Sequence, residues 1–144
     1  MPKSAEKQPR IVVGVDGSNG GAHALKWAAE EAAFRDALLE IHSAWGPGYV
    51  FVNPKEIRRV LNGIVDAAAE RAAEFAPGVA IAKEIHEGSP GQVLVEASDG
   101  ATLLVVGSRG LGRLKGAFLG SVSTECALHA RCPVLVVRDR HEDE

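Results

Sequence analysis

The sequence predicts a single three-layer, doubly wound α/β domain, with helices on both faces of a mostly parallel sheet of about five strands. Three observations favour this class. Segments typical of strands alternate with segments typical of helices along the 144-residue chain. Ile11–Val15 and Leu103–Val106 are short and apolar throughout, as strands buried on both faces are. The joints between segments are short, which favours crossover connections between parallel strands.

The first strand and helix are predicted between residues 11 and 33. Ile11–Val15 is the strand, and Ser18 has a side chain of the kind that caps a helix N-terminus. An apolar stripe at helical spacing follows. It comprises Ala22, Leu25, Ala29, Ala32 and Ala33.

The second strand and helix are predicted between residues 38 and 78. The strand covers Leu38–Ala44, and Trp45–Tyr49 breaks it with a Gly-Pro-Gly sequence. Asn53–Glu56 is typical of a helix start, with Asn as the cap, Pro at the first helical position and Glu at the third. Pro77–Gly78 ends this helix. Its predicted apolar stripe comprises Ile57, Val60, Leu61, Ile64, Ala68 and Phe75.

The rest of the chain continues the alternation. The predicted elements are a strand over Val79–Ile85, a helix capped at Ser89 and closed by Asp99–Gly100, a strand over Leu103–Val106, a helix from about Ser121 to Ala130 and a strand over Pro133–Val137.

Composition and charge exclude several classes of protein. The chain has 16 Lys and Arg against 19 Asp and Glu, a net charge of −3, so a general cationic grip on nucleic acid is not expected. No segment approaches the roughly 20 apolar residues that cross a bilayer. The start lacks the apolar stretch of a signal peptide and two cysteines make no disulfide framework, so we expect a cytoplasmic protein. We expect residues 1–9 to form a loose arm and residues 139–144 a solvated acidic tail.

Two predicted strands end in unusual sequences. Asp16–Ser18 follows the first strand, and Gly107–Gly110 follows the fourth. Ligands of open α/β sheets bind beyond the carboxyl ends of the strands, where the strand order reverses. If these two strands are neighbours, both turns face one cleft.

A glycine-rich segment runs from Gly107 to the predicted helix start at Gly120–Ser121. Its glycines let backbone N–H groups approach an anion, and the two serine hydroxyls and the helix N-terminus converge at its end. This chemistry is typical of a polyphosphate site, and the alternative is a flexible surface loop with incidental cations. The segment contains Gly107, Gly110, Gly112, Gly116, Gly120, Arg109, Arg113, Lys115, Ser121 and Ser123.

Other nucleotide and hydrolase motifs fail on spacing. No stretch fits G-x-x-x-x-G-K-[ST], and Gly110-Leu-Gly112 is followed by a glycine one residue too late for the dinucleotide fingerprint. No G-x-S-x-G nucleophile elbow is present.

The spacing Gly107-2x-Gly110-9x-Gly120-Ser121 resembles the ATP-binding signature of the universal stress protein family. The opening Ile11–Ser18 is similar to the first strand and turn of that family, and the resemblance extends from about Arg10 to Arg138. It implies a fold like that of the adenine nucleotide alpha hydrolases, with strand order 3-2-1-4-5. It also implies ATP or a related adenine nucleotide as ligand, with Mg²⁺ held mainly by the phosphates.

The resemblance assigns nucleotide contacts residue by residue. Asp16 would lie by the adenine or ribose, and the serines at the last helix would bind phosphate. Ser43 follows His42 where the family often has His-Val, so the backbone contact to adenine there is in doubt. The implied residues are Asp16, Gly17, Ser18, Ser43, Gly107, Ser108, Arg109, Gly110, Gly120, Ser121, Val122 and Ser123.

Other interpretations stay open for several of these side chains. Asp16 could instead cap the helix that follows it, and Arg109 and Arg113 could be solvated loop charges. Trp45 and Tyr49 could cover an adenine pocket or simply pack or be exposed.

The cysteines and histidines give no sign of a redox or metal centre. Cys126 and Cys132 are expected to be packed small side chains rather than a redox pair. The five histidines show no ligand spacing, so no protein-built metal site is expected. They are His23, His42, His86, His129 and His141.

The absence of a catalytic pair favours a nucleotide-dependent stress-response regulator over a dedicated enzyme. Slow ATP hydrolysis stays open, with Asp16 as the one candidate base. A nucleotide-independent dimeric interaction or chaperone-like module is the alternative function. The resemblance implies a homodimer paired through Val134–Val137, unless residues 138–144 cover that strand.

Overall fold

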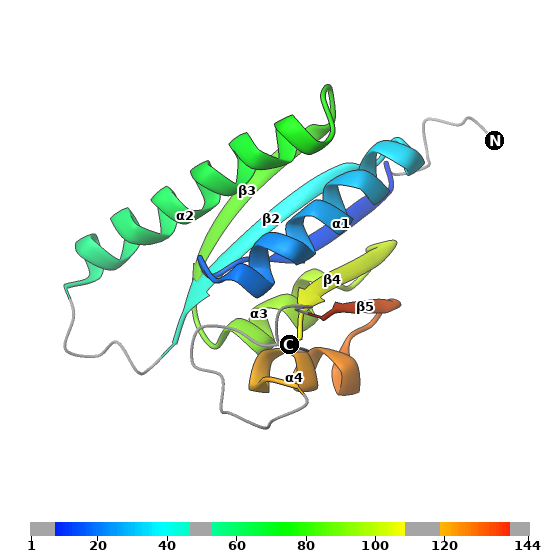
Figure 1. Cartoon of the computed structure of the whole chain (residues 1–144). Coiled ribbons are helices and arrows are strands. Elements are labelled where there is room, and N and C mark those ends of the chain that lie inside the picture. The colour runs from blue at the N-terminus through cyan, green and yellow to red at the C-terminus, as the bar shows by residue number, and fades with distance from the viewer. Residues whose placement is uncertain (1–7, 47–52, 109–118, 139–144) are drawn as a thin grey trace, which may run out of the picture.

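A parallel five-stranded sheet in the order β3-β2-β1-β4-β5 forms the centre of the protein (Figure 1). The computed structural model describes residues 8–46, 53–108 and 119–138. The elements are β1 (Arg10–Gly14), α1 (Asn19–Arg35), β2 (Leu38–Trp45), α2 (Pro54–Phe75), β3 (Ala80–Glu87), α3 (Pro90–Ala97), β4 (Leu103–Gly107), α4 (Ser121–His129) and β5 (Val134–Val137). The predicted fold class and strand order are confirmed.

Helices cover both faces of the sheet. On one face Ile11 and Val13 pack with residues of α1 and α2, and on the other Val12 packs with Leu94 of α3 and Cys126 of α4. The three β1 residues are fully buried. Burial on both faces explains why this strand is apolar without alternation.

The predicted helix starts are found at the expected residues. The Ser18 hydroxyl accepts a hydrogen bond from the Gly21 N–H at 3.2 Å, and the Asn53 side chain accepts one from the Lys55 N–H at 2.8 Å. Ser89 occupies the N-cap position of α3, but its side chain makes no capping bond. Pro90 occupies the first helical position of α3, where the backbone N–H that proline lacks would have no partner within the helix.

The buried stripes of the two long helices differ in part from the prediction. Ala22 and Ala33 of α1 are exposed, and Val60 of α2 is 56% exposed. Alanine occupies both buried and exposed positions of α1, so the apolar pattern does not choose among neighbouring stripes. The buried residues are Gly20, Gly21, Ala24, Leu25, Ala28, Ala29 and Ala32 in α1, and Ile57, Leu61, Val65, Ala68 and Ala72 in α2.

Strand β2 runs one residue past its predicted end and includes Trp45. This indole is buried and packs with Ile57 and Leu61 of α2. Strand β3 likewise extends to Glu87, because it pairs with β2 along its whole length. Trp45 therefore packs against α2. Tyr49 lies outside the described residues.

The predicted terminal segments lie largely outside the residues that the structure describes. Residues 8 and 9 are the described part of the predicted arm, and the Pro9 carbonyl accepts a hydrogen bond from the Leu38 N–H at 2.9 Å. The predicted tail, residues 139–144, is outside the described ranges. In those ranges, none of the helices combines the length and apolar character needed to cross a bilayer.

Candidate functional site

The carboxyl ends of β1 and β4 lie side by side at the centre of the sheet. Val13 of β1 pairs with Val105 of β4, and the chain order reverses between these strands. Such a reversal leaves a crevice beyond the strand ends, since the helices that follow leave toward opposite faces. The two turns that the sequence singled out therefore share one edge of the sheet.

The turn after β1 is closed by its own side chains. Asp16 Oδ1 accepts a hydrogen bond from the Ser18 N–H at 2.9 Å, and Gly17 adopts φ 86°, which favours glycine. Ser18, rather than Asp16, is the residue that caps α1. Asp16 thus fixes the turn and lies just before the first turn of α1.

Close backbone contact joins this turn to the end of β4. A Cβ atom added at Gly107 would lie 2.7 Å from the Gly20 carbonyl oxygen and 2.8 Å from its carbon. A side chain at residue 107 would therefore displace the first turn of α1. Gly107 has a structural role here, which is to let α1 begin directly against β4.

Ser108 and Ser123 tie the start of α4 to the end of β4. The Ser108 carbonyl accepts hydrogen bonds from the Gly120 N–H at 2.6 Å and from the Ser123 hydroxyl at 2.7 Å. The Ser108 N–H donates to the Val137 carbonyl at 2.8 Å. Ser123 is only 1% exposed, so its hydroxyl serves this internal bond. The phosphate contact that the resemblance implied for Ser123 stays a prediction.

The N-terminus of α4 presents backbone donors at this edge. Gly120 occupies the cap position and no side chain caps the helix. The first intrahelical donor is the Thr124 N–H, which bonds the Gly120 carbonyl at 3.0 Å. The N–H groups of Ser121, Val122 and Ser123 therefore have no acceptor within the helix, as in sites that bind phosphate. Ser121 is exposed and adds a hydroxyl to them.

Ser43 has a structural contact on the neighbouring strand. Its buried hydroxyl donates to the Val15 carbonyl at 2.7 Å, and the Val15 N–H donates to the His42 carbonyl at 2.9 Å. These bonds extend the pairing of β1 with β2 beyond Gly14. The Ser43 side chain thus orients the chain that leads to Asp16.

The structure brings together most of the residues predicted to bind nucleotide. Three segments meet at the sheet edge, at the ends of β1 and β4 and the start of α4. They contain Asp16, Gly17, Ser18, Gly107, Ser108, Gly120, Ser121, Val122 and Ser123. Arg109 and Gly110 lie outside the described residues, as do Arg113 and Lys115.

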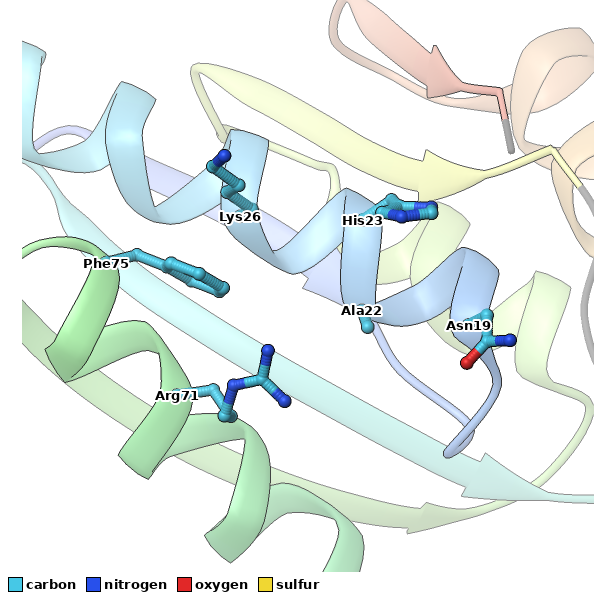
Figure 2. A pocket seen from close by; sticks show the side chains of 6 residues that line it. All are labelled: Asn19, Ala22, His23, Lys26, Arg71 and Phe75. Atoms are coloured by element: carbon cyan, nitrogen blue, oxygen red, sulfur yellow. The ribbon is translucent and has the colours of Figure 1, made fainter. Parts of the chain in front are cut away.

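A hollow of about 360 Å³ lies between α1 and α2 (Figure 2). It is lined by residues of these two helices alone, including the cations Lys26 and Arg71. The Arg71 guanidinium lies 5.4 Å from the centre of the Phe75 ring, a cation–π distance. Its lining contains none of the residues predicted to bind nucleotide.

Cys126 of α4 lies in the core between α4 and the sheet, and Cys132 packs against the same cluster, as expected. Cys126 is fully buried and Cys132 is partly buried. Burial, with smaller effects from Glu125 and Cys132, raises the pKa of the Cys126 thiol to about 11. Burial also raises the pKa of Cys132. Both groups are therefore protonated thiols at neutral pH and poor nucleophiles.

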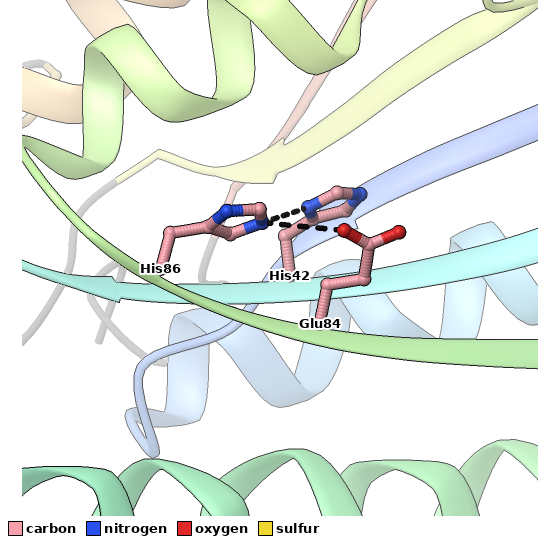
Figure 3. Close-up of side chains that lie close together, drawn as sticks. All are labelled: His42, Glu84 and His86. Carbon is pink, nitrogen blue, oxygen red and sulfur yellow. Dashed lines mark hydrogen bonds and ion pairs between the residues drawn. The ribbon is translucent and has the colours of Figure 1, made fainter.

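The structure groups two histidines that the sequence did not connect. His42 and His86 lie on adjacent strands, with His42 Nδ1 2.9 Å from His86 Nε2. Glu84 lies beside them (Figure 3). The signal in the sequence is their period-two spacing, Glu84 and His86 on one strand and Glu40 and His42 on the other. That signal needs the register of β2 and β3 to be read.

Comparisons with known proteins agree with this architecture. The family model described as the universal stress protein family matches residues 9–138. Universal stress protein Rv2624c of Mycobacterium tuberculosis is 38% identical over 138 residues, which cover 90% of this chain and 48% of the relative. A universal stress protein of Mycolicibacterium smegmatis is 33% identical, covering 88% of this chain and 47% of the relative. The chain spans about half the length of these curated relatives.

Solved structures give the same result for the fold. A universal stress protein in complex with cAMP has a TM-score of 0.74 and 30% identity, covering 92% of this chain and 98% of its own. UspA from Lactobacillus plantarum has a TM-score of 0.78 at 22% identity, covering 92% and 99%. Because the family model matches residues 9–138, nearly the whole chain, this protein belongs to the universal stress protein family.

Proposed function

We propose that this protein binds ATP with Mg²⁺ at the shared edge of β1 and β4 and acts as a nucleotide-dependent regulator in the stress response. The observation that carries the proposal is the uncapped N-terminus of α4, fixed to the end of β4 by Ser108 and Ser123. Three backbone donors and a helix dipole there suit an anion. The 30% identical neighbour with cAMP supports an adenine nucleotide as the anion.

Each part of the site has a distinct role in this proposal. The N–H groups of Ser121, Val122 and Ser123, with the Ser121 hydroxyl, bind phosphate. Asp16 contacts the adenine or ribose from the turn that its own carboxylate closes. Arg109 and Gly110 would join them from the signature loop, and Mg²⁺ is held chiefly by the phosphates.

The same geometry favours binding over rapid turnover. Hydrolysis needs a positioned water and stabilisation of the transition-state charge. Asp16 is the candidate base, yet its Oδ1 already accepts the Ser18 N–H. We therefore propose that any ATPase activity is slow and that the nucleotide acts mainly as a signal.

We expect freshly purified protein to carry an adenine nucleotide or to bind Mg-ATP on addition. Nucleotide released by denaturation is identified by chromatography and mass, and emptied protein is titrated calorimetrically with Mg-ATP, with Mg-GTP as the comparison. At 100 times Kd, ATP would stabilise the fold by about 2.7 kcal/mol, visible as a raised Tm. No heat and no stabilisation at millimolar Mg-ATP would refute the proposal and favour a nucleotide-independent interaction module.

We also propose that two copies pair through β5. This strand lies at the edge of the sheet and is paired with β4 alone among the described strands. The Pro133 carbonyl accepts a hydrogen bond from the Leu104 N–H of β4, and the Val137 carbonyl accepts one from the Ser108 N–H just after β4. Alternation therefore directs the backbone groups of Val134 and Val136 to the open edge. Val134 and Val136 are only partly buried. An apolar edge of this kind is suited to pairing with a second copy.

Val136→Pro is expected to convert a dimer to a monomer with little change in Tm. Proline removes one N–H from the open edge but none from the ladder to β4. Val136→Thr keeps that N–H and the β-branched shape, and should remain a dimer. Molar mass measured by light scattering after gel filtration decides the matter. A monomeric parent protein, or a dimeric Val136→Pro variant, would contradict this interface.

A further inference from the structure

Two imidazoles and a carboxylate converge on the face of the sheet opposite α1 and α2. His42 of β2 is in register with Glu84 of β3 and Ala44 with His86, so these side chains point to one side. Figure 3 shows them directed away from α2. The His42 and His86 rings are nearly parallel, with planes 9° apart and centroids 5.1 Å apart. His42 Nδ1 is 2.9 Å from His86 Nε2, and that nitrogen is 3.7 Å from Glu84 Oε1.

A second layer of charges orients His42. Its Nε2 lies 3.0 Å from Glu40 Oε1, and the same oxygen accepts a bond from Arg10 Nη1 at 3.0 Å. Arg10 is itself held by the Asp99 carbonyl at 2.8 Å. Because a carboxylate can only accept, the His42 proton is assigned to Nε2 and the Nδ1 lone pair faces His86. A carboxylate behind the far nitrogen of an imidazole is the usual support of a metal-ligating histidine.

The second imidazole faces the His42 ring with its Nε2. A neutral His86 can hold its proton on either nitrogen. Moving that proton from Nε2 to Nδ1 leaves one lone pair on each facing nitrogen, and rotation of the His86 side chain would turn both toward one cation.

The spacing of the three donor atoms suits a small tetrahedral cation. All three lie within 4.8 Å of one another. Zn²⁺ with bonds of about 2.0–2.1 Å holds its ligand atoms about 3.3–3.4 Å apart, between the two observed separations of 2.9 and 3.7 Å. Small side-chain rotations would suffice, because Glu84 is exposed and His86 only partly buried.

We propose that His42 Nδ1, His86 Nε2 and the Glu84 carboxylate form a Zn²⁺ site, with a fourth position open to water. Two imidazoles and one carboxylate favour zinc over Mg²⁺ or Ca²⁺, which prefer oxygen ligands. None of its three ligands is among the residues assigned to the nucleotide, although His42 directly precedes Ser43, where the resemblance implies an adenine contact. It does not depend on whether the protein binds ATP.

The test uses the full chain without an affinity tag, freed of metal by a chelator and titrated calorimetrically with ZnCl₂. We expect one Zn²⁺ per chain and no binding of Mg²⁺ under the same conditions. Loss of a residue that hydrogen-bonds a metal ligand typically weakens metal binding by roughly 10–100-fold. Glu40→Gln should weaken zinc binding within that range. His86→Ala removes a ligand itself and should weaken it further. Glu84→Gln, which keeps the shape of the side chain, should also weaken binding.

Matched controls separate this site from other zinc ligands. His129→Ala removes an exposed histidine of α4, and Cys132→Ser removes the more accessible thiol; both should bind zinc as the parent does. Circular dichroism verifies that each variant is folded. Co²⁺ in place of Zn²⁺ should give visible bands without thiolate charge transfer.

Three outcomes would overturn the proposal. The parent protein could take up no Zn²⁺ at submillimolar concentration, His86→Ala could bind it equally well, or a thiolate band could appear with Co²⁺. In the first two cases the histidine pair is a hydrogen bond that fastens β3 to β2, and in the third the metal binds the cysteines.

Discussion

Ser121→Pro is expected to weaken Mg-ATP binding by about 10–100-fold without lowering the Tm of the nucleotide-free protein. Proline is favoured at the first position of a helix, and Gly120 before it has φ −79° and ψ 175°, the extended conformation that a residue before proline prefers. The fold therefore does not need the Ser121 N–H. Loss of a hydrogen bond to a charged phosphate costs about 1.5–3 kcal/mol, which corresponds to that range of affinity.

Two further variants identify which atoms of α4 matter. Ser121→Ala removes the hydroxyl and keeps the N–H, so it should weaken ATP binding less than Ser121→Pro does. Ser123→Ala breaks the bond to the Ser108 carbonyl and should lower the Tm as well as the affinity, since its hydroxyl is buried. Calorimetric titration and thermal melts of each protein provide both readouts. An unchanged ATP affinity in a folded Ser121→Pro protein would exclude the α4 N-terminus as the phosphate site.

The sequence was sufficient to predict the fold class because burial on both faces leaves a direct mark on composition. Ile11–Val13 and Leu104–Val106 must be apolar at every position, and no other strand environment requires that. Strand order could not be predicted in the same way. Local sequence patterns do not indicate which strands are neighbours, so the order 3-2-1-4-5 was predicted only from the resemblance to a family.

The sequence could not predict which residues of the helices are buried, because several neighbouring faces have the same apolar pattern. In α1, alanine occupies both exposed positions such as Ala22 and Ala33 and buried ones such as Ala24 and Ala28. Hydrophobicity alone does not separate them. The choice is made by contact with β1 and β4, where small side chains allow the helix to lie close to the sheet.

Within the candidate site, the sequence predicted which segments lie together but not which internal contacts their side chains make. Glycine and serine are the residues that a phosphate site needs, but they also suit tight internal contacts. Gly107 makes room for Gly20, and the hydroxyls of Ser43 and Ser123 bond to backbone carbonyls. The direction of a hydroxyl depends on tertiary contacts that spacing does not encode.

The contact between the two histidines could not be predicted either, because it also depends on tertiary structure. His42 and His86 are 44 residues apart, and neither lies near another histidine in the sequence. They meet because β2 and β3 are parallel neighbours with Ala44 opposite His86. A search for ligand spacing along one segment cannot find a cluster that strand register creates.

Gly107→Ala is expected to lower the free energy of unfolding by about 1–3 kcal/mol, the usual cost of overpacking, and to weaken ATP binding with it. The new Cβ would lie 2.7 Å from the Gly20 carbonyl oxygen, a backbone atom that cannot rotate away, so the first turn of α1 must move. That movement would separate Asp16 from the start of α4. Gly63→Ala is the control, because nothing lies within 4 Å of its added Cβ and alanine favours a helix interior, so it should preserve or raise stability. Urea unfolding measures both variants, and a Gly107→Ala protein as stable as the parent would show that β4 and α1 do not approach this closely.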